Sequence, residues 1–362
     1  MLKNAFWYDT IVFKESYASC FIERAAYPAI IRKRRRCMFN RILGTFVFEH
    51  FASTTPTGQR KGVFHMDLTR KQFDVLSTLE TSKEKLSQRQ LEEKTGHSLG
   101  TINKAMKEFV EKGFVKDGQI TPAGIDALEP YRARKAIFIA AGFGTRLVPI
   151  TLNTPKPLVR VNGKRIIDSL IDACLEAGIS EIYIVRGYLS EQFDQLLYKY
   201  PMIKFLENPS YNEANNISSA MAARYLMQNA YVFEADLLIS NPKIITKYHY
   251  NSDVLGIWKK RTDDWCLDVD KDGFVCEEKV GGLNTYQMVG IYYFNASDGA
   301  KLSEHINEAF LAPGGKERYW ETVPNQAYKG QYKIEVRPCK DEDIVEIDTF
   351  RELKAIDRTY DV

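Results

Sequence analysis

The sequence has few cysteines and no long apolar run, and these absences exclude several classes of protein. Its six cysteines include no Cys-x-x-Cys pair, which argues against a zinc site and against a disulfide framework. No uninterrupted apolar run approaches the roughly 18 residues that cross a bilayer. Lys14 and Glu15 interrupt the N-terminus where a signal peptide needs an apolar core. We therefore expect a cytoplasmic protein with reduced thiols and no membrane insertion.

The positive charge of the chain is concentrated in its first segment. Residues 1–65 carry eleven Lys and Arg against four Asp and Glu, a net charge of +7, so the remainder of a chain whose total is +3 is net −4. The basic run at residues 32–36 suits nucleic acid or an anionic membrane surface, but the segment lacks helical or strand periodicity. We expect residues 1–65 to be an upstream extension outside the natural protein, with Met66 as the biological start.

Residues 66–130 show the pattern of a small helical domain. Ser87 followed by Gln90 is a capping box for one helix, and Ser98 begins another that runs to Lys112. Asp117-Gly118 then predicts a two-residue hairpin turn, and Thr121-Pro122 predicts the start of a further helix.

This order of helices and hairpin resembles a winged helix-turn-helix domain of bacterial transcriptional regulators. The resemblance implies DNA binding through exposed residues of the helix that begins at Ser98 and of the hairpin, or wing, that follows it, namely Thr101, Asn103, Lys104, Lys107 and Lys116. Glu108 and Glu111 lie on the same helix, and residues 66–362 are net acidic. A role in dimerisation or regulation therefore remains the alternative.

Residues 135–161 carry the strongest chemical signal in the chain. The apolar run at residues 136–141 is typical of a buried strand of a parallel sheet. Gly142 and Gly144 follow directly, where their lack of side chains would let backbone amides approach a phosphate. Leu147 stands where a dinucleotide fingerprint needs glycine, and the P-loop sequence Gly-Lys-Ser/Thr is missing too.

The pattern of strands and helices after this loop predicts an α/β domain over residues 131–362. Helical spacing at residues 165–177 alternates with short apolar strands near residues 181–185, 203–206 and 231–236. This order favours a Rossmann-like fold, with a mixed, mainly parallel sheet between helices and ligands at the carboxyl ends of the strands.

The glycine loop resembles the signature of the nucleotidyltransferases that make sugar and alcohol nucleotides. The matching residues are Gly142, Gly144, Thr145, Arg146, Leu147, Pro149 and Pro155-Lys156-Pro157. The resemblance implies that Lys156, Arg146 and Asp236 are catalytic. The residues expected to bind the nucleotide are Ala140, Ala141, Gly142, Gly144, Thr145, Arg146, Asn216 and Ser218.

The segment at residues 211–226 narrows the resemblance. Asn215-Asn216 followed by Ser218-Ser219 is similar to bacterial CTP:phosphocholine cytidylyltransferases, whereas sugar-nucleotide enzymes tend to carry Gly-Thr-Ala there. The same residues also form an ordinary helix cap. We expect CTP and a phosphocholine-like acceptor as substrates.

Two aspartates are the candidate metal ligands. Asp236 ends an apolar strand, where an oxygen ligand for Mg²⁺ bridging nucleotide phosphates is expected. The resemblance implies that Asp236 and Asp348 hold the metal together. Asp268 and the residues up to Gly273 look like an EF-hand loop, but Lys279 occupies its twelfth position, so we interpret this stretch as a hairpin turn.

Aromatic and acidic residues are the candidates for binding the acceptor. A quaternary ammonium offers no hydrogen-bond donor, so aromatic faces and negative charge must recognise it. By the resemblance, the residues in this role are Trp265, Tyr319, Trp320, Glu321 and Glu346. Ordinary core packing is the alternative for each aromatic residue.

The expected reaction transfers CMP from CTP to phosphocholine or a similar amino-alcohol phosphate and releases pyrophosphate. One alternative is a sugar-1-phosphate or polyol-phosphate nucleotidyltransferase. Another is a DNA-binding regulator that senses nucleotides. The sequence leaves the oligomeric state open, with a homodimer as one candidate.

Overall fold

The computed structural model describes residues 67–82 and 84–361. The predicted basic extension, residues 1–65, lies outside the described residues. Among the helices within them, none is long and apolar enough to cross a membrane.

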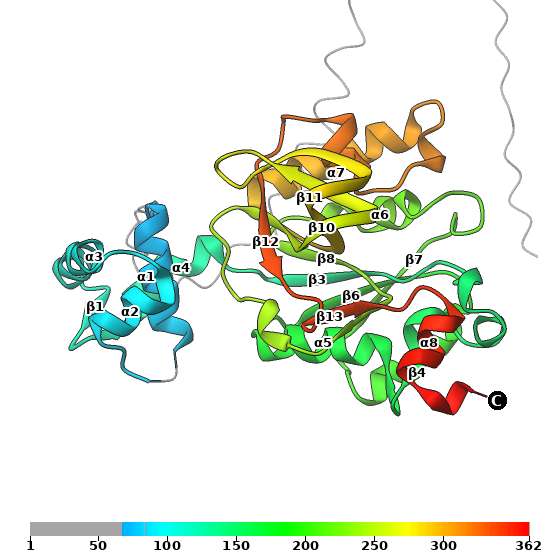
Figure 1. Cartoon of the computed structure of the whole chain (residues 1–362), viewed down its shortest axis with the longest axis horizontal. Coiled ribbons are helices and arrows are strands. Elements are labelled where there is room, and N and C mark those ends of the chain that lie inside the picture. The colour runs from blue at the N-terminus through cyan, green and yellow to red at the C-terminus, as the bar shows by residue number, and fades with distance from the viewer. Residues whose placement is uncertain (1–66, 83, 362) are drawn as a thin grey trace, which may run out of the picture. The chain divides into compact units, whose positions relative to one another are not determined.

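The first described elements form three helices, a short hairpin and a fourth helix (Figure 1). In chain order they are α1 (Arg70–Thr81), α2 (Gln88–Thr95), α3 (Leu99–Glu111), β1 (Val115–Lys116), β2 (Gln119–Ile120) and α4 (Pro122–Leu128). The capping box of Ser87 and Gln90 forms as expected, and Gly96 ends α2 in the left-handed conformation. Thr121 caps α4. The predicted winged-helix fold is confirmed.

The remaining elements form the α/β part of the chain. They are β3 (Lys135–Ile139), β4 (Arg160–Val161), β5 (Lys164–Arg165), α5 (Ile166–Glu176), β6 (Glu181–Arg186), β7 (Lys204–Glu207), α6 (Ile217–Ala223), β8 (Ala230–Glu234), β9 (Leu237–Ile239), β10 (Ser252–Val269), β11 (Val275–Phe294), α7 (Ala296–Leu311), β12 (Ile334–Cys339), β13 (Ile344–Glu346) and α8 (Phe350–Ile356).

Seven of these strands, within the described part of the chain, form one mixed sheet in the order β12-β10-β11-β8-β3-β6-β7. Strand β3 lies between β6 and β8 and is parallel to both. Only β11 runs antiparallel to its neighbours β10 and β8 in this sheet of the described residues. The expected Rossmann-like, mainly parallel architecture is confirmed.

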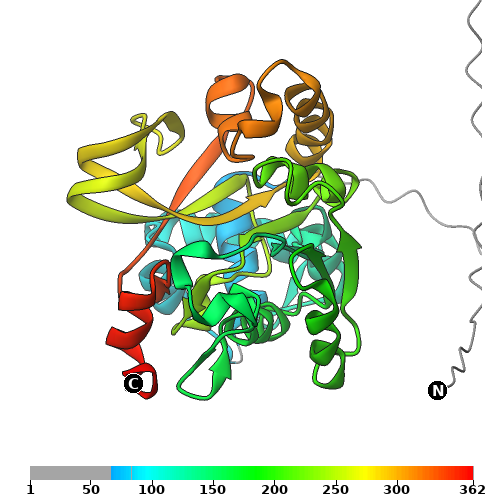
Figure 2. The ribbon, with the colours of Figure 1, turned by 90° about the vertical axis from the view of Figure 1, so that its right-hand side faces the viewer.

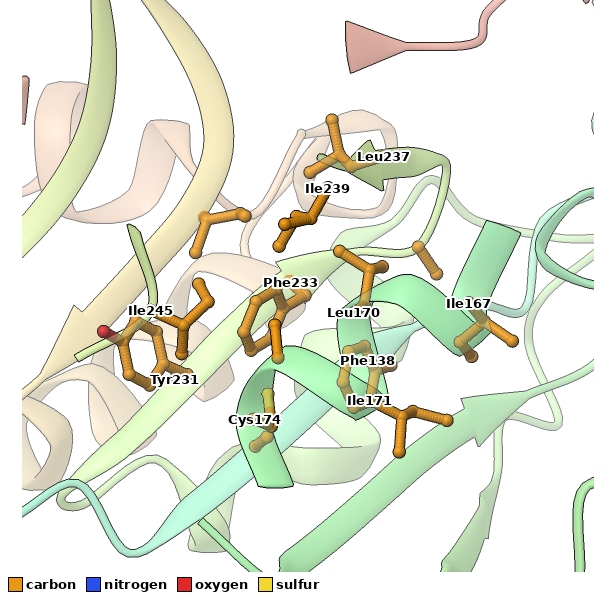
Figure 3. Close-up of a cluster of buried hydrophobic side chains, with 14 of the residues drawn as sticks. Phe138, Ile167, Leu170, Ile171, Cys174, Tyr231, Phe233, Leu237, Ile239 and Ile245 are labelled. Carbon is orange, nitrogen blue, oxygen red and sulfur yellow. The ribbon is translucent and has the colours of Figure 1, made fainter. Parts of the chain in front are cut away.

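Two apolar cores cover the two faces of this sheet. On one face, α5 packs Ile167, Leu170 and Ile171 against Phe138 and Phe233 (Figure 3). The rings of Phe138 and Phe233 stack with centroids 4.8 Å apart. On the other face, α6 and α7 pack against β3 and β8. Because β3 is buried on both faces, its apolar run fixes the position of the loop that follows it.

Strands β10 and β11 form a long hairpin whose far end reaches beyond the sheet (Figure 2). The hairpin turns at residues 270–273, where Gly273 has φ 86° and its N–H donates to the carbonyl of Asp270. The interpretation of this stretch as a hairpin turn is therefore confirmed.

The close approach of α4 to the hairpin β1–β2 gives a test of the winged-helix packing. A Cβ at Gly124 would overlap the carbonyl oxygen of Phe114 and lie 2.7 Å from Ile120, whereas a Cβ at Gly100 would meet nothing within 4 Å. We expect Gly124→Ala to destabilise the protein by about 1–3 kcal/mol. Gly100→Ala should be neutral or stabilise by up to about 1 kcal/mol. Thermal unfolding followed by circular dichroism measures both, and equal effects would contradict the packing.

Candidate functional site

The glycine loop directly follows β3, at the carboxyl edge of the sheet. Gly144 has φ 62°, and a Cβ there would lie 3.0 Å from Lys156 Cβ and 3.1 Å from Thr151 Cγ2. The Thr151 hydroxyl donates to the Gly144 carbonyl at 2.8 Å. Gly144 is thus required both by its backbone conformation and by the close approach of the Lys156 segment.

A first cavity of about 310 Å³ lies beside this loop. Its wall contains the end of β3, the loop, the start of α6 and the end of β8. Of the predicted nucleotide-binding residues, those in the wall are Ala140, Ala141, Gly142, Gly144, Arg146, Asn216 and Ser218. Thr145 is in the same loop and does not line the cavity.

Lys156 is a buried cation held between two carboxylates at this edge. Its Nζ lies 2.8 Å from Asp236 Oδ2 and 3.0 Å from Asp348 Oδ1. Arg146 forms an ion pair with the other oxygen of Asp348. Burial lowers the pKa of Lys156, but the charges and hydrogen bonds of Asp236 and Asp348 outweigh it and leave the pKa raised. Lys156 therefore stays charged. The structure brings together Lys156, Asp236 and Asp348, which the sequence analysis predicted to act together.

A short strand pairing places Asp348 beside Asp236. Strand β13 runs antiparallel to β9, with Glu346 opposite Leu237. The N–H of Ile347 then donates to the carbonyl of Asp236 at 3.1 Å. This pairing holds two carboxylates that are far apart in the sequence at one point.

Glu234 and Glu321 form a second acidic group, linked by the side chain of Asn216. The Asn216 amide donates to both carboxylates, at 3.2 Å to Glu234 and 3.3 Å to Glu321, and Trp320 Nε1 donates to Glu234 at 2.9 Å. Burial raises the pKa of both glutamates, and the neighbouring charge of Glu321 adds to the rise at Glu234. The pair therefore retains a proton at a higher pH than separate carboxylates would.

Two residues predicted to bind the nucleotide have other partners in the structure. The side-chain N–H groups of Asn216 donate to the two glutamates, and its Oδ1 accepts from the backbone N–H of Trp320 at 2.9 Å. The Ser218 hydroxyl donates to the Asn215 carbonyl and accepts from Asn208. Both side chains therefore position the cavity wall, and their polar atoms are already engaged.

A second cavity of about 260 Å³ adjoins the first and shares with it Arg146, Asn216, Glu234 and Asp236. Four of the five predicted acceptor-binding residues line it, namely Trp265, Tyr319, Glu321 and Glu346. The ring centroids of Trp265 and Tyr319 lie 6.0 Å apart.

Trp320 is the exception, and the expectation that it lines an aromatic cage is corrected by its burial. Its side chain is fully buried and packs edge-on against Tyr292 and Phe294. The ring therefore belongs to the core and does not line the cavity, although its indole N–H donates to Glu234.

Sequence reasoning missed Glu278, which also lines the second cavity. It follows Glu277 on β11, and adjacent strand residues point to opposite faces. Glu277 is exposed and Glu278 is buried. The adjacent pair of glutamates was a signal that one carboxylate would point inward.

Comparisons with known proteins find relatives for both parts of the chain. Residues 135–255 match the nucleotidyl transferase family, and residues 66–119 match the MarR family. A 2-aminoethylphosphonate cytidylyltransferase of Lancefieldella rimae is 38% identical over 62% of this chain and 92% of its own length. The chain belongs to the cytidylyltransferase family.

A further match in sequence and a match to a solved structure support this assignment. The choline-phosphate cytidylyltransferase of Streptococcus pneumoniae is 30% identical over 62% of this chain and 96% of its own length. The solved structure of a CTP:phosphocholine cytidylyltransferase from Streptococcus pneumoniae aligns with a TM-score of 0.58 and 29% identity, covering 63% of this chain and 99% of that one.

The acidic residues of this cytidylyltransferase-family chain fit a divalent cation. Asp236, Glu346 and Asp348 each offer a carboxylate oxygen, and these atoms all lie within 4.8 Å of one another. Asp236 Oδ1 is buried without a hydrogen-bond partner among the described residues. Carboxylate oxygens are the ligands that Mg²⁺ prefers, so this donor set suits the ion.

Metal binding can be tested by thermal unfolding. We expect millimolar MgCl₂ to raise the melting temperature by about 3 °C, because a ligand that binds the folded state stabilises it. Asp348→Asn should remove the rise. Lys156→Ala should enlarge it, because the ammonium competes for the same carboxylates. Glu342→Gln, an exposed carboxylate outside the cluster, is the control, and a rise that survives in Asp236→Asn/Asp348→Asn would contradict the site.

Proposed function

We propose that the protein transfers CMP from CTP to a small phosphate or phosphonate that carries a positively charged nitrogen, in a reaction that depends on Mg²⁺. One observation carries the proposal: the first cavity, beside the glycine loop, and the second cavity share Arg146, Asn216, Glu234 and Asp236. A nucleotide in the first cavity and an acceptor in the second would meet at the shared residues.

The proposed binding of CTP depends on the glycine loop and on the cations Arg146 and Lys156. The amides at Gly142 and Gly144 suit the β- and γ-phosphates of CTP, and Arg146, whose side chain is 67% exposed, can reach them. Lys156 would turn its ammonium from Asp236 and Asp348 toward the α-phosphate and the incoming phosphate. A charge-assisted contact of this kind neutralises two anions that otherwise repel each other.

The reaction needs positioning more than covalent chemistry. An anionic oxygen of the acceptor attacks the α-phosphorus in line, a new P–O bond forms, and the bond from the α-phosphorus to the bridging oxygen of pyrophosphate breaks. The acceptor oxygen is ionised near neutral pH, so no general base is required. Mg²⁺ held by Asp236, Asp348 and Glu346 would supply positive charge that polarises the α-phosphate.

The acceptor end favours a cation. Seven carboxylates line the second cavity, against one guanidinium, among the described residues. Lys156 and Mg²⁺ would balance Asp236, Asp348 and Glu346, but a neutral sugar would leave Glu278 without a compensating charge. The relatives act, by their names, on 2-aminoethylphosphonate and on choline phosphate, and both of these acceptors carry a positively charged nitrogen. Phosphocholine and aminoalkyl phosphates or phosphonates are thus the acceptors that we propose.

A panel measuring pyrophosphate release tests this function. We expect turnover with CTP and at least one ammonium-bearing acceptor, little with UTP or dTTP, and none with glucose 1-phosphate. Lys156→Ala should lower kcat by about 10²- to 10³-fold, because it removes preorganised charge at the transferred phosphate. The exposed Lys340→Ala is the control. Full turnover by Lys156→Ala, or a preference for sugar phosphates, would contradict the proposal.

The match to the MarR family supports DNA binding as a second function. Asn103, Lys104 and Lys107 are exposed on α3, and Lys116 is exposed on β1. Their side chains suit DNA phosphates and base edges.

Fluorescence anisotropy with a labelled DNA duplex tests this second function. We expect binding that weakens with salt, and we expect Lys104→Ala and Lys107→Ala each to reduce the slope of log K against log salt by about 1. Lys94→Ala, an exposed lysine on α2, should leave the slope unchanged. A chain that binds no duplex at low salt would exclude the role.

A further inference from the structure

Glu278 is a buried residue on the lining of the second cavity. Its side chain lines the cavity, and the residue is 7% exposed. Neither of its carboxylate oxygens has a hydrogen-bond partner among the described residues. An unpaired buried charge is costly, so the geometry calls for a ligand or a proton at this position.

Among the described residues, the two cations nearest in the sequence or on the cavity lining have other partners than Glu278. Lys279, the next residue, forms an ion pair with Asp268, and Arg146, which also lines the cavity, forms an ion pair with Asp348. Burial and the charge of Glu321 raise the pKa of Glu278 to about 7, although nearby Asn325 and Gln326 partly offset the rise. A cationic ligand would relieve this unfavourable environment.

The cavity offers more carboxylate oxygens than aromatic faces. A quaternary ammonium has no N–H group and needs several aromatic faces around it. Trp320 is fully buried and does not line the cavity, which leaves Trp265 and Tyr319 as the aromatic residues on the lining of this cavity in the described chain. A primary ammonium has three N–H donors, and the Glu278 carboxylate, whose oxygens are buried without a hydrogen-bond partner among the described residues, can accept from it once the side chain turns into the cavity.

We propose that Glu278 binds the nitrogen of the acceptor and makes the site selective for a primary ammonium over a quaternary one. This inference rests on the proposed function. Trp265 and Tyr319 would then cover the carbon chain between the ammonium and the phosphorus group. Both a 2-aminoethyl phosphate ester and the corresponding phosphonate present this ammonium, and they differ at the reacting end alone.

Steady-state kinetics with four acceptors test the inference, namely 2-aminoethyl phosphate, 2-aminoethylphosphonate, phosphocholine and ethyl phosphate. The wild-type protein should prefer one or both primary-ammonium acceptors to phosphocholine by at least about 10-fold in kcat/KM. Glu278→Gln should raise KM for these acceptors by about 10- to 100-fold, the worth of a hydrogen bond to a charged group. It should leave KM for CTP and the turnover of ethyl phosphate within about twofold.

Two variants and one stability measurement separate binding from a structural role. Glu277→Gln, which changes the exposed neighbour on the same strand, should behave as the wild type. Glu278→Asp keeps the negative charge on a side chain that is shorter by one methylene, so it should raise KM less than Glu278→Gln does. At pH 8 the melting temperature of Glu278→Gln should equal or exceed that of the wild type, because an unpaired buried charge has been removed.

The outcomes that overturn the inference are distinct. Equal losses with ethyl phosphate and with the primary-ammonium acceptors, or a lower melting temperature with unchanged KM, would assign Glu278 a structural role. Preference of the wild type for phosphocholine would exclude the selectivity. A wild-type protein that turns over none of the four acceptors with CTP would overturn the proposed function, and this inference with it.

Discussion

The placement of Lys156 between Asp236 and Asp348 is the interaction on which the site depends. Two carboxylates so close together would repel each other strongly in a partly buried setting, and the ammonium at 2.8 and 3.0 Å balances them. In the proposed reaction this balance would be exchanged, with phosphates attracting the lysine while a metal binds the carboxylates. A site that handles several phosphate charges needs opposite charges that can be redistributed in this way.

The sheet explains why residues so distant in the sequence meet. The parallel strands β3 and β8 are neighbours, so the glycine loop after β3 and Asp236 after β8 emerge at the same edge. Asp348 reaches that edge by a different route, through the pairing of β13 with β9. The capping box of α8 joins Thr349 and Glu352, and Glu352 also accepts from the Asp348 N–H at 2.9 Å, which fixes the backbone there.

Local sequence patterns predicted the elements well because capping, turn and burial signals agreed along the chain. The capping box at Ser87 and the hairpin turns at Gly118 and Gly273 are local chemistry and form as predicted. The meeting of Asp236 and Asp348 depends on a nonlocal strand pairing, so resemblance rather than periodicity suggested it. Trp320 was misplaced for a related reason: only the fold decides which face of a segment is buried. The predicted domain boundary at residues 130–131 and the roles of the site residues stay predictions.

The second cavity contains buried carboxylates that are unfavourable for folding but suited to binding a cation. A core that served folding alone would pair or replace Glu278, Glu234 and Glu321, because buried carboxylates near one another are unfavourable. Retaining them lowers the stability of the ligand-free protein and strengthens its attraction for a cation. Such a site discriminates by what the wrong ligand leaves unsatisfied: a ligand without N–H donors leaves buried oxygens unpaired, and this penalty is larger than the loss of an apolar contact. Under the proposed function, the acidic wall would therefore select among small acceptors by their charge and their N–H donors.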